Sequence, residues 1–314
     1  MPTSAQPPLT AASAALPIDG PPRALGPVAQ LGESPLWCTD TASLYWCDIE
    51  GRRVHRLQPD SGAAACWAFD TEPACCALGR DGRLRVACRD GLWALDVHTG
   101  ARERLVAAPY DAAAERFNDG RCDAAGRWWI GTLRDRRDAP LASLYRWADG
   151  RLMRMAGEVT VANGLAFSPD QRTLYWSDTT AHTIYAQDHD PATGAIRARR
   201  VFARFEPKPS SGDLSGYGGR PDGAAVDAQG CLWVACFEGS RLVRLSPSGE
   251  QLGELPLPVR CPTMPCFGGP GLRTLYITTA RHGRPADELA AQPWAGHVLA
   301  VPVGVPGLPA AHVA

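Results

Sequence analysis

The sequence lacks most of the features that mark membrane, nucleic-acid-binding and serine-nucleophile proteins. In its 314 residues no apolar run approaches the roughly 18 residues that cross a bilayer. The formal net charge is −1, so no strong field draws the chain to nucleic acids or membrane surfaces. A GxSxG motif is absent, which argues against a serine nucleophile at a strand-to-helix turn. We therefore expect neither nucleic-acid nor membrane partners.

The eleven cysteines form no CxxC pair. Several stand in strand-like stretches, where free cysteine behaves as a small apolar residue: Cys47, Cys75, Cys88 and Cys236. This pattern indicates reduced thiols and a cytoplasmic location. Residues 1–22 are rich in Pro and Ala but lack a basic start and a continuous apolar core, so we expect a mobile tail rather than a secretion signal.

What the sequence does contain is a repeat. A turn residue, a small or polar step, and a Leu or aromatic residue inside a β-rich run recur six times. The copies align on Leu44, Leu84, Trp128, Leu174, Leu232 and Leu275. Successive copies are 40, 44, 46, 58 and 43 residues apart, close to the length of a four-stranded propeller blade. Helical periodicity is confined to 286–292, which argues against alternating strands and helices.

Six such units predict an all-β fold, a single six-bladed β-propeller over residues 23–314. Each blade is expected to be a four-stranded antiparallel sheet, and the blades surround a central channel. Closing the ring removes the strand edges that an open row of blades would expose. The segment ALGPVAQ, residues 24–30, is expected to supply the outer strand of the last blade and so to join the two ends of the ring.

Polar residues recur 10 or 11 positions before the aligned residue, in the strand that lines the channel of a propeller. Four copies place a carboxylate or an amide there: Glu33, Asn118, Asn163 and Asp222. The second and sixth copies offer Glu72-Pro73 and Met264-Pro265 instead. Three of the four polar residues are followed by a Gly within two positions, and Glu33 is followed by Pro35, which indicates tightly packed backbone near the axis.

Two interpretations of these polar residues compete. Asn-Gly and Asp-Gly are common turn dipeptides, so each residue taken alone fits a turn. Converging carboxylates would repel one another unless a cation joined them, and oxygen ligands suit hard or borderline divalent ions. The shared position in four copies favours the second interpretation, a divalent metal at the mouth of the channel.

At these residues the sequence resembles the gluconolactonase/regucalcin (senescence marker protein) family of six-bladed propellers. The resemblance begins near Leu31 and rests on GESPLW, RFNDGRCDAAGRWWIGT, ANGLAFSPDQRTLYWSD, PDGAAVDAQGCLWVACFEGSRLVRL and CFGGPGLRTLYITTAR, in that order. It implies a carboxylic-ester hydrolase that opens a sugar lactone to the aldonic acid with the help of a metal. Phosphotriester hydrolysis and non-catalytic calcium binding stay open, because one scaffold serves several functions.

The resemblance also implies roles for individual residues. Glu33, Asn163 and Asp222 match ligands of one divalent ion, whose identity stays open between calcium, zinc, manganese, magnesium and iron(II). Arg116 and Asn118 match residues that hold the sugar lactone. Asp222 is the candidate catalytic base, with Glu33 and a hydroxide on the metal as alternatives.

One stretch departs from the family pattern. Shortly after the GT of the third repeat, such proteins tend to carry an acidic residue that contacts the substrate. Here the stretch reads GTLRDRRDAP, which puts Arg136 near that place, with Asp135 and Asp138 beside it. The departure leaves the preferred sugar open.

Two further expectations concern the surface. The insertion SSGDLSGYGG, residues 210–219, is expected to overhang the channel and to shape the pocket, with a solvated connector as the alternative. None of the seven histidines falls at an inner blade position. His98, His182 and His189 fall in outer hairpins and are expected to be solvated.

Overall fold

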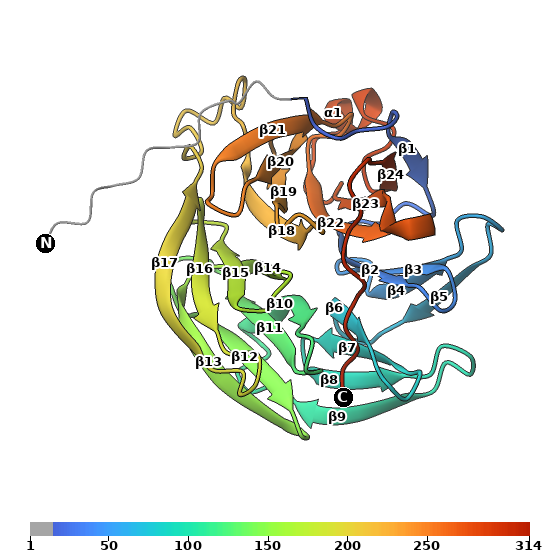
Figure 1. Ribbon diagram of the computed structural model, residues 1–314. Helices are drawn as coiled ribbons and strands as arrows, with labels where there is room; N and C mark the ends of the chain where they lie inside the picture. Colours follow the sequence, from blue (N-terminus) through green and yellow to red (C-terminus); the bar gives the residue numbers. More distant parts are fainter. Residues whose placement is uncertain (1–14) are drawn as a thin grey trace, which may run out of the picture.

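The computed structural model describes residues 15–314, and it confirms the six-bladed β-propeller (Figure 1). In this part of the chain, 24 strands form six four-stranded antiparallel sheets around one axis. Blade 1 contains β2 (Gly32–Cys38), β3 (Ser43–Asp48), β4 (Arg53–Leu57) and β5 (Ala64–Ala68). Blade 2 contains β6 (Pro73–Leu78), β7 (Leu84–Cys88), β8 (Gly91–Leu95) and β9 (Arg102–Ala107).

The other blades repeat this order from the axis outward. Blade 3 contains β10 (Glu115–Cys122), β11 (Trp128–Arg134), β12 (Ala142–Ala148) and β13 (Arg151–Val159). Blade 4 contains β14 (Ala162–Phe167), β15 (Thr173–Asp178), β16 (Thr183–His189) and β17 (Ile196–Arg204). Blade 5 contains β18 (Arg220–Val226), β19 (Leu232–Phe237), β20 (Arg241–Leu245) and β21 (Gln251–Pro256). Blade 6 contains β22 (Pro262–Gly268), β23 (Thr274–Thr279), β24 (Val298–Pro302) and β1 (Arg23–Leu25).

The first and last strands of the chain share blade 6 and lie side by side (Figure 1). Strand β1 pairs with β24 in antiparallel fashion, with Leu25 opposite Val298. The predicted closure is therefore confirmed, with a shorter strand than the segment 24–30. Residues 1–14 of the predicted tail lie outside the described residues. Residues 15–22 run along the last blade, where Ile18 forms a β-bridge with Val303.

Apolar side chains between neighbouring blades hold the ring together. The six aligned residues of the repeat all lie in the second strand of a blade and are buried. Each of the six apolar clusters fills the space between two adjacent blades. The second strands are thus covered on both faces, whereas outer strands such as β5 alternate between half-buried and exposed residues. This difference explains why the repeat is most regular at the second strand.

The turn aspartates of two repeats serve as buried anchors. Asp227 accepts hydrogen bonds from the Trp233 indole N–H at 2.9 Å and from the Arg244 guanidinium at 2.7 Å. Asp123 accepts the equivalent bond from Trp129, also at 2.9 Å. Buried carboxylates need such partners because desolvation is costly. These anchors fix the turn between the first two strands of blades 3 and 5.

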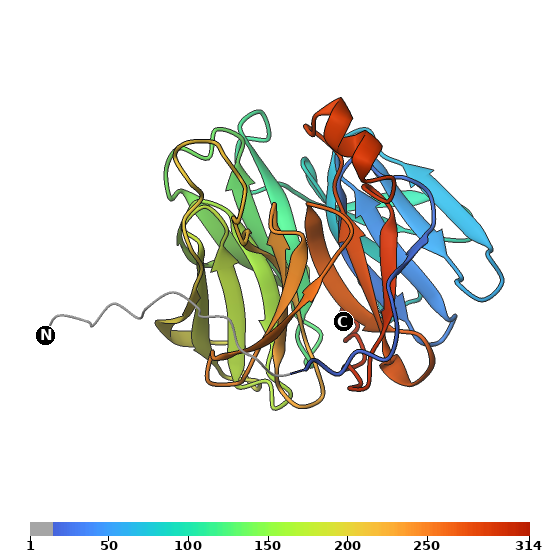
Figure 2. The same ribbon diagram turned by 90° about the horizontal axis from the view of Figure 1, so that it is seen from above.

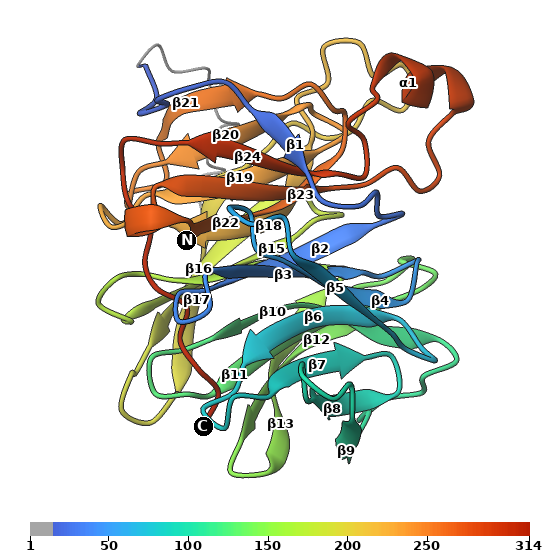
Figure 3. The same ribbon diagram turned by 90° about the vertical axis from the view of Figure 1, so that its right-hand side faces the viewer.

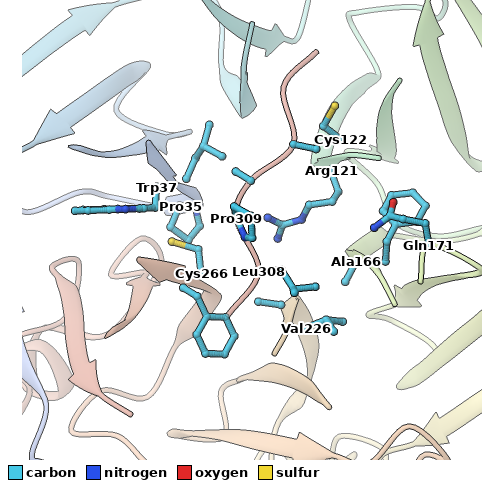
Figure 4. Close-up of a pocket in the computed structure, with 16 residues that line it drawn as sticks. Pro35, Trp37, Arg121, Cys122, Ala166, Gln171, Val226, Cys266, Leu308 and Pro309 are labelled. Carbon is cyan, nitrogen blue, oxygen red and sulfur yellow. The ribbon is translucent and has the colours of Figure 1, made fainter. Parts of the chain in front are cut away.

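The C-terminal tail crosses one end of the channel (Figures 1 and 4). Gly307 forms a β-bridge with Asp227 of blade 5, and Val313 forms one with Gly79 of blade 2. Figure 4 shows Leu308 and Pro309 over the centre of a cavity of about 100 Å³ at this end.

Beneath this tail, the charged side chain that lines the small cavity, Arg121, already has hydrogen-bond partners in the protein. The Arg121 guanidinium donates to the carbonyl oxygens of Leu165 and Ala224 at 3.1 and 2.9 Å. The remaining candidate for a functional site is the other end of the channel.

The single α-helix of the described residues, α1 (Ala286–Ala291), stands on the face opposite the C-terminal tail (Figures 2 and 3). It coincides with the one stretch in which the sequence shows helical periodicity. A short 3-10 helix, η1 (Pro270–Leu272), links β22 and β23. No helix of the described residues is long and apolar enough to cross a membrane.

Candidate functional site

A cavity of about 530 Å³ lies next to α1, since its lining residue Arg284 forms a salt bridge with Glu288 of that helix. It lies where the innermost strands β2, β10, β14 and β18 begin and where the second strands of five blades end. A volume of this size is typical of small-molecule sites. All five residues predicted for the site line this cavity: Glu33, Arg116, Asn118, Asn163 and Asp222.

A one-residue bulge in each innermost strand lies at the level of these side chains. In blade 4, for example, Asn163 pairs with Ser177 and Ala166 pairs with Tyr175, so one extra residue stands in β14. The same irregularity follows Glu33 in β2 and occurs between residues 117 and 120 in β10 and between 221 and 224 in β18. A bulge kinks a strand and redirects its side chains. The polar motifs of the sequence are thus the bulges that turn these residues toward the cavity.

Glycines beside the polar residues allow the innermost strands to approach closely. A Cβ atom at Gly223 would lie 2.3 Å from the Cβ of Met264 on the neighbouring blade. At Gly164, which has φ +61, a Cβ would lie 2.8 Å from the carbonyl oxygen of Asp222. Both contacts are too short for any side chain, and the positive φ also favours glycine. The tight packing predicted from these motifs is confirmed.

The floor of the cavity is formed by two carboxylates and an amide. Asn163 donates a hydrogen bond to Asp222, and Glu33 faces them from blade 1. Burial raises the pKa of Asp222 to about 7, in spite of the nearby Arg220. Burial, with repulsion from Asp222, also raises the pKa of Glu33 well above its ordinary range. Neither carboxylate has a salt-bridge partner among residues 15–314.

This donor set fits a divalent cation. The described residues contain no group of three His, Cys, Asp or Glu side chains that could hold a metal, so a third donor beside the two carboxylates would be an amide. The Asn163 side-chain oxygen accepts one hydrogen bond, from Gly164 N at 3.1 Å, and keeps a lone pair for a cation. Two buried carboxylates that form no salt bridge with the described residues, and one amide oxygen, are hard donors of the kind such ions prefer.

Asp119, which sequence reasoning treated only as part of a motif, lies just below the floor. It accepts hydrogen bonds from Leu165 N and Gly120 N, both at 2.7 Å. Burial raises its pKa to about 6. Because both carboxylate oxygens bind backbone N–H groups, Asp119 joins β10 to β14 and is a structural residue of the site.

Arg116 and Asn118 form a hydrogen-bonded pair on β10. The Arg116 Nη1 donates to the Asn118 side-chain oxygen and to the Phe117 carbonyl, both at 2.9 Å. Asn118 in turn donates to the Ala162 carbonyl at 3.1 Å. The Nε and Nη2 groups of Arg116 have no hydrogen-bond partner among the described residues, so they are available to a ligand.

Residues 31–281 match the family described as the SMP-30/gluconolactonase/LRE-like region. The chain belongs to this family. A 6-deoxy-6-sulfogluconolactonase of Pseudomonas putida is 47% identical over 280 residues, which cover 88% of this chain and 92% of that protein. A pentonolactonase of Haloferax volcanii is 36% identical over 254 residues, with coverages of 80% and 82%. The crystal structure of the calcium-binding protein regucalcin from Agrobacterium tumefaciens has a TM-score of 0.87 at 27% identity, covering 96% of this chain and 99% of that one.

In this member of the SMP-30/gluconolactonase family the cavity also holds residues that sequence reasoning missed. Arg220, His282 and Arg284 line it from β18 and from the loop after β23. The Glu238 carboxylate lies behind them and contacts Arg284 at 3.2 Å, Arg220 at 3.5 Å and Lys208 at 2.9 Å. In the sequence, only the presence of charged residues next to the PDG motif and after the last repeat could have indicated these cavity residues.

The basic residue after the GT motif was predicted one position too early. Arg137, not Arg136, lines the cavity. Its φ of 52 places it in the left-handed region, which an arginine adopts only where a turn requires it. The predicted neighbour Asp135 is bound to Arg89 of blade 2.

One surface expectation is wrong, and a second holds for only one of three histidines, since His98 alone is exposed. Residues 210–219 do not line the cavity, whose wall on this side begins at Arg220. Tyr217 instead packs inward, and its hydroxyl lies 2.7 Å from His182 Nε2. His182 and His189 are both buried; His189 lies 3.6 Å from Asp123. These histidines join outer hairpins to other segments of the fold.

Proposed function

We propose that the chain hydrolyses a sugar lactone to the corresponding aldonic acid and that it uses one divalent cation to do so. The observation that carries the proposal is the arrangement of three buried side chains in one cavity. Glu33 and Asp222 are carboxylates that form no salt bridge with the described residues, and the arginine beside them has free N–H groups. The lactonase names of two relatives support the same reaction class.

Glu33, Asn163 and Asp222 are the proposed ligands of the cation. When bound, a divalent ion polarises the lactone carbonyl and stabilises the negative charge that develops on its oxygen. The carboxylate and amide donors admit calcium, zinc, manganese, magnesium and iron(II). The regucalcin neighbour, described as calcium-binding, supports calcium as the first ion to test.

Arg116 and Asn118 are the proposed substrate-holding residues. Asn118 fixes one edge of the guanidinium, and the free Nε and Nη2 groups of Arg116 donate to oxygen atoms of the substrate. Because this pair is buried and hydrogen-bonded on one side, it loses little freedom when the substrate binds.

Asp222 is the proposed base, with Glu33 as the alternative. The base removes a proton from water while the water oxygen bonds to the lactone carbonyl carbon. The bond between that carbon and the ring oxygen then breaks, and the proton passes to the ring oxygen. A carboxylate held next to the reacting water can take up a proton and return it in this way.

Two finer points belong to the proposal. Among the substrates named for the relatives, we favour a sulfonated hexonolactone over a pentonolactone, because the cavity is lined by several arginines. We place the reaction in the cytoplasm, because all eleven cysteines are free thiols, as reducing compartments maintain them. Most are buried, and burial raises the pKa of thiols such as Cys236, to about 12.

The test is acid release followed in a pH-stat. Chelated protein is supplied in turn with each of the five ions and with gluconolactone, xylonolactone, arabinonolactone, galactonolactone and 6-deoxy-6-sulfogluconolactone. We expect ion-dependent hydrolysis of at least one lactone, lost in Asn163→Ala and kept in the exposed control Asp188→Asn. Tight ion binding without hydrolysis of any lactone would show a calcium-binding protein instead.

A further inference from the structure

Four arginines line the cavity, and they differ in whether a carboxylate neutralises them. Arg220 and Arg284 both contact Glu238, and Arg284 also forms a salt bridge with Glu288 at 2.6 Å. By contrast, Arg116 and Arg137 form no salt bridge with any of the described residues. The unpaired positive charge of the cavity therefore lies on blade 3, which carries both of these arginines.

The unpaired state of Arg137 has a local cause. This residue lies in the turn between β11 and β12, two positions after Asp135. Arg89 of blade 2 holds the Asp135 carboxylate through two hydrogen bonds of 3.0 and 3.1 Å. The Asp135 carboxylate is thus already engaged. Asp138, next to Arg137 in sequence, forms no salt bridge among the described residues, and the exposed Arg137 side chain lines the cavity without either carboxylate.

Arg116 is the second unpaired charge, and it lies at depth. Its side chain is only 5% exposed, and its hydrogen bonds use Nη1 alone. Burial, followed by the charge of Arg137, lowers the pKa of Arg116 to about 10. Both guanidinium groups line the same cavity, and an anion bound between them would offset the repulsion of their charges.

We propose that Arg116 and Arg137 form a subsite for an oxyanion carried by the lactone substrate, a sulfonate or a phosphate group. This inference rests on the proposed function and specifies its substrate class. Planar guanidinium groups donate paired N–H bonds that match two oxygens of such an anion. Arg116 belongs to this subsite and also forms the hydrogen-bonded pair with Asn118. One substrate molecule therefore spans the carboxylate floor of the cavity and the two arginines.

Three acidic residues line the cavity; Glu33 and Asp222 are the proposed cation ligands, and the third makes the subsite testable in both directions. Glu50, exposed at the end of β3, lines the same cavity. It forms no salt bridge with either arginine among residues 15–314. Its negative charge repels an anionic substrate, so a neutral residue at this position strengthens the binding of the anion, whereas a neutral residue at 137 weakens it.

The experiment compares kcat/KM for 6-sulfo-, 6-phospho- and unsubstituted gluconolactone in the ion-loaded protein. Arg137→Gln should lower kcat/KM for the anionic lactones by roughly 10- to 100-fold, the value of a charge-assisted hydrogen bond, and leave the neutral lactone within about twofold. Glu50→Gln should raise kcat/KM for the anionic lactones. Arg136→Gln, the adjacent arginine that does not line the cavity, is the matched control and should change none of them.

The salt dependence gives a second readout. Added NaCl should raise KM for the anionic lactones in the wild-type protein and do so less in Arg137→Gln, because an exposed charge is screened. The charged lactone with the larger wild-type kcat/KM carries the anionic group, sulfonate or phosphate, that the subsite prefers.

Two results would overturn the subsite. One is an equal loss on neutral and charged lactones in Arg137→Gln; the other is a wild-type preference for the neutral lactone. If the wild type hydrolyses no lactone, the proposed function fails, and calorimetry with sulfate and phosphate ions still tests the subsite alone. Binding that is equal in the wild type and in Arg137→Gln would then refute it.

Discussion

Replacing Asp222 by asparagine separates the stability of the metal-free fold from the binding of the proposed cation. The ionised carboxylate is buried and has no salt-bridge partner in the described part of the chain, so it destabilises the fold until a cation neutralises it. Asparagine has nearly the same shape and no charge. We therefore expect Asp222→Asn to be more stable than the wild type without a cation, and to lose the stabilisation that a cation brings.

The size of the effect follows from the raised pKa of Asp222. Below the ordinary value of 3.8 the side chain is protonated in both the folded and the unfolded chain, and the protein has its full stability. As pH rises toward about 7 the unfolded chain releases the proton first, so the stability falls and levels off above that pH. At 1.36 kcal/mol for each pKa unit, the loss is about 4 kcal/mol.

Thermal unfolding after treatment with a chelator measures this difference. For a domain of this size about 1 kcal/mol shifts Tm by roughly 2 °C, so the variant should melt about 8 °C above the wild type at pH 8 and close to it at pH 4. Calcium should raise the Tm of the wild type but not of the variant. The exposed control Asp188→Asn should match the wild type throughout. A variant that melts at or below the wild-type temperature at pH 8 would refute the reasoning.

Three further substitutions test the framework around the site. Gly223→Ala forces a Cβ against the neighbouring strand and should cost about 1 to 3 kcal/mol in urea unfolding; unchanged stability would contradict the close approach. Asp227→Ala removes the buried partner of Arg244 and should cost about 3 to 5 kcal/mol, whereas a cost below about 1 kcal/mol would count against the anchor. Tyr217→Phe removes the hydrogen bond to His182 and should lower the free energy of unfolding by about 1 kcal/mol. It should also speed proteolysis within 206–216; an unchanged cleavage rate would show that this hydrogen bond does not hold the segment in place.

Much of the fold was predictable because each blade repeats one physical requirement. The second strand is covered on both faces, so every copy needs a large apolar residue after its turn. Equivalent positions in the rest of the blade can be counted from this residue. Counting back from Leu174 or Leu232 reaches Asn163 or Asp222. The predicted site residues come together because they occupy the same bulge in successive innermost strands.

The parts that sequence reasoning missed lie where no repeat applies. In the turn after β11 nothing periodic tells which of two adjacent arginines faces the cavity, and the left-handed backbone of Arg137 decides it. The hydrogen-bond partner of His182 is 35 residues away, in an irregular segment. The C-terminal tail likewise bridges blades through single β-bridges, such as that of Val313. Such contacts depend on the closed ring and leave no local pattern.

The closure of blade 6 sets an order for biosynthesis. His297 Nδ1 contacts the Gly26 carbonyl across 271 residues at 3.0 Å, next to the pairing of β1 with β24. While the chain emerges from the ribosome, β1 has no partner until almost all of the protein has been made. Contacts of such long separation form late and slowly. Nascent chains that stop before β24 therefore keep unpaired strand edges, which chaperones would have to protect from aggregation.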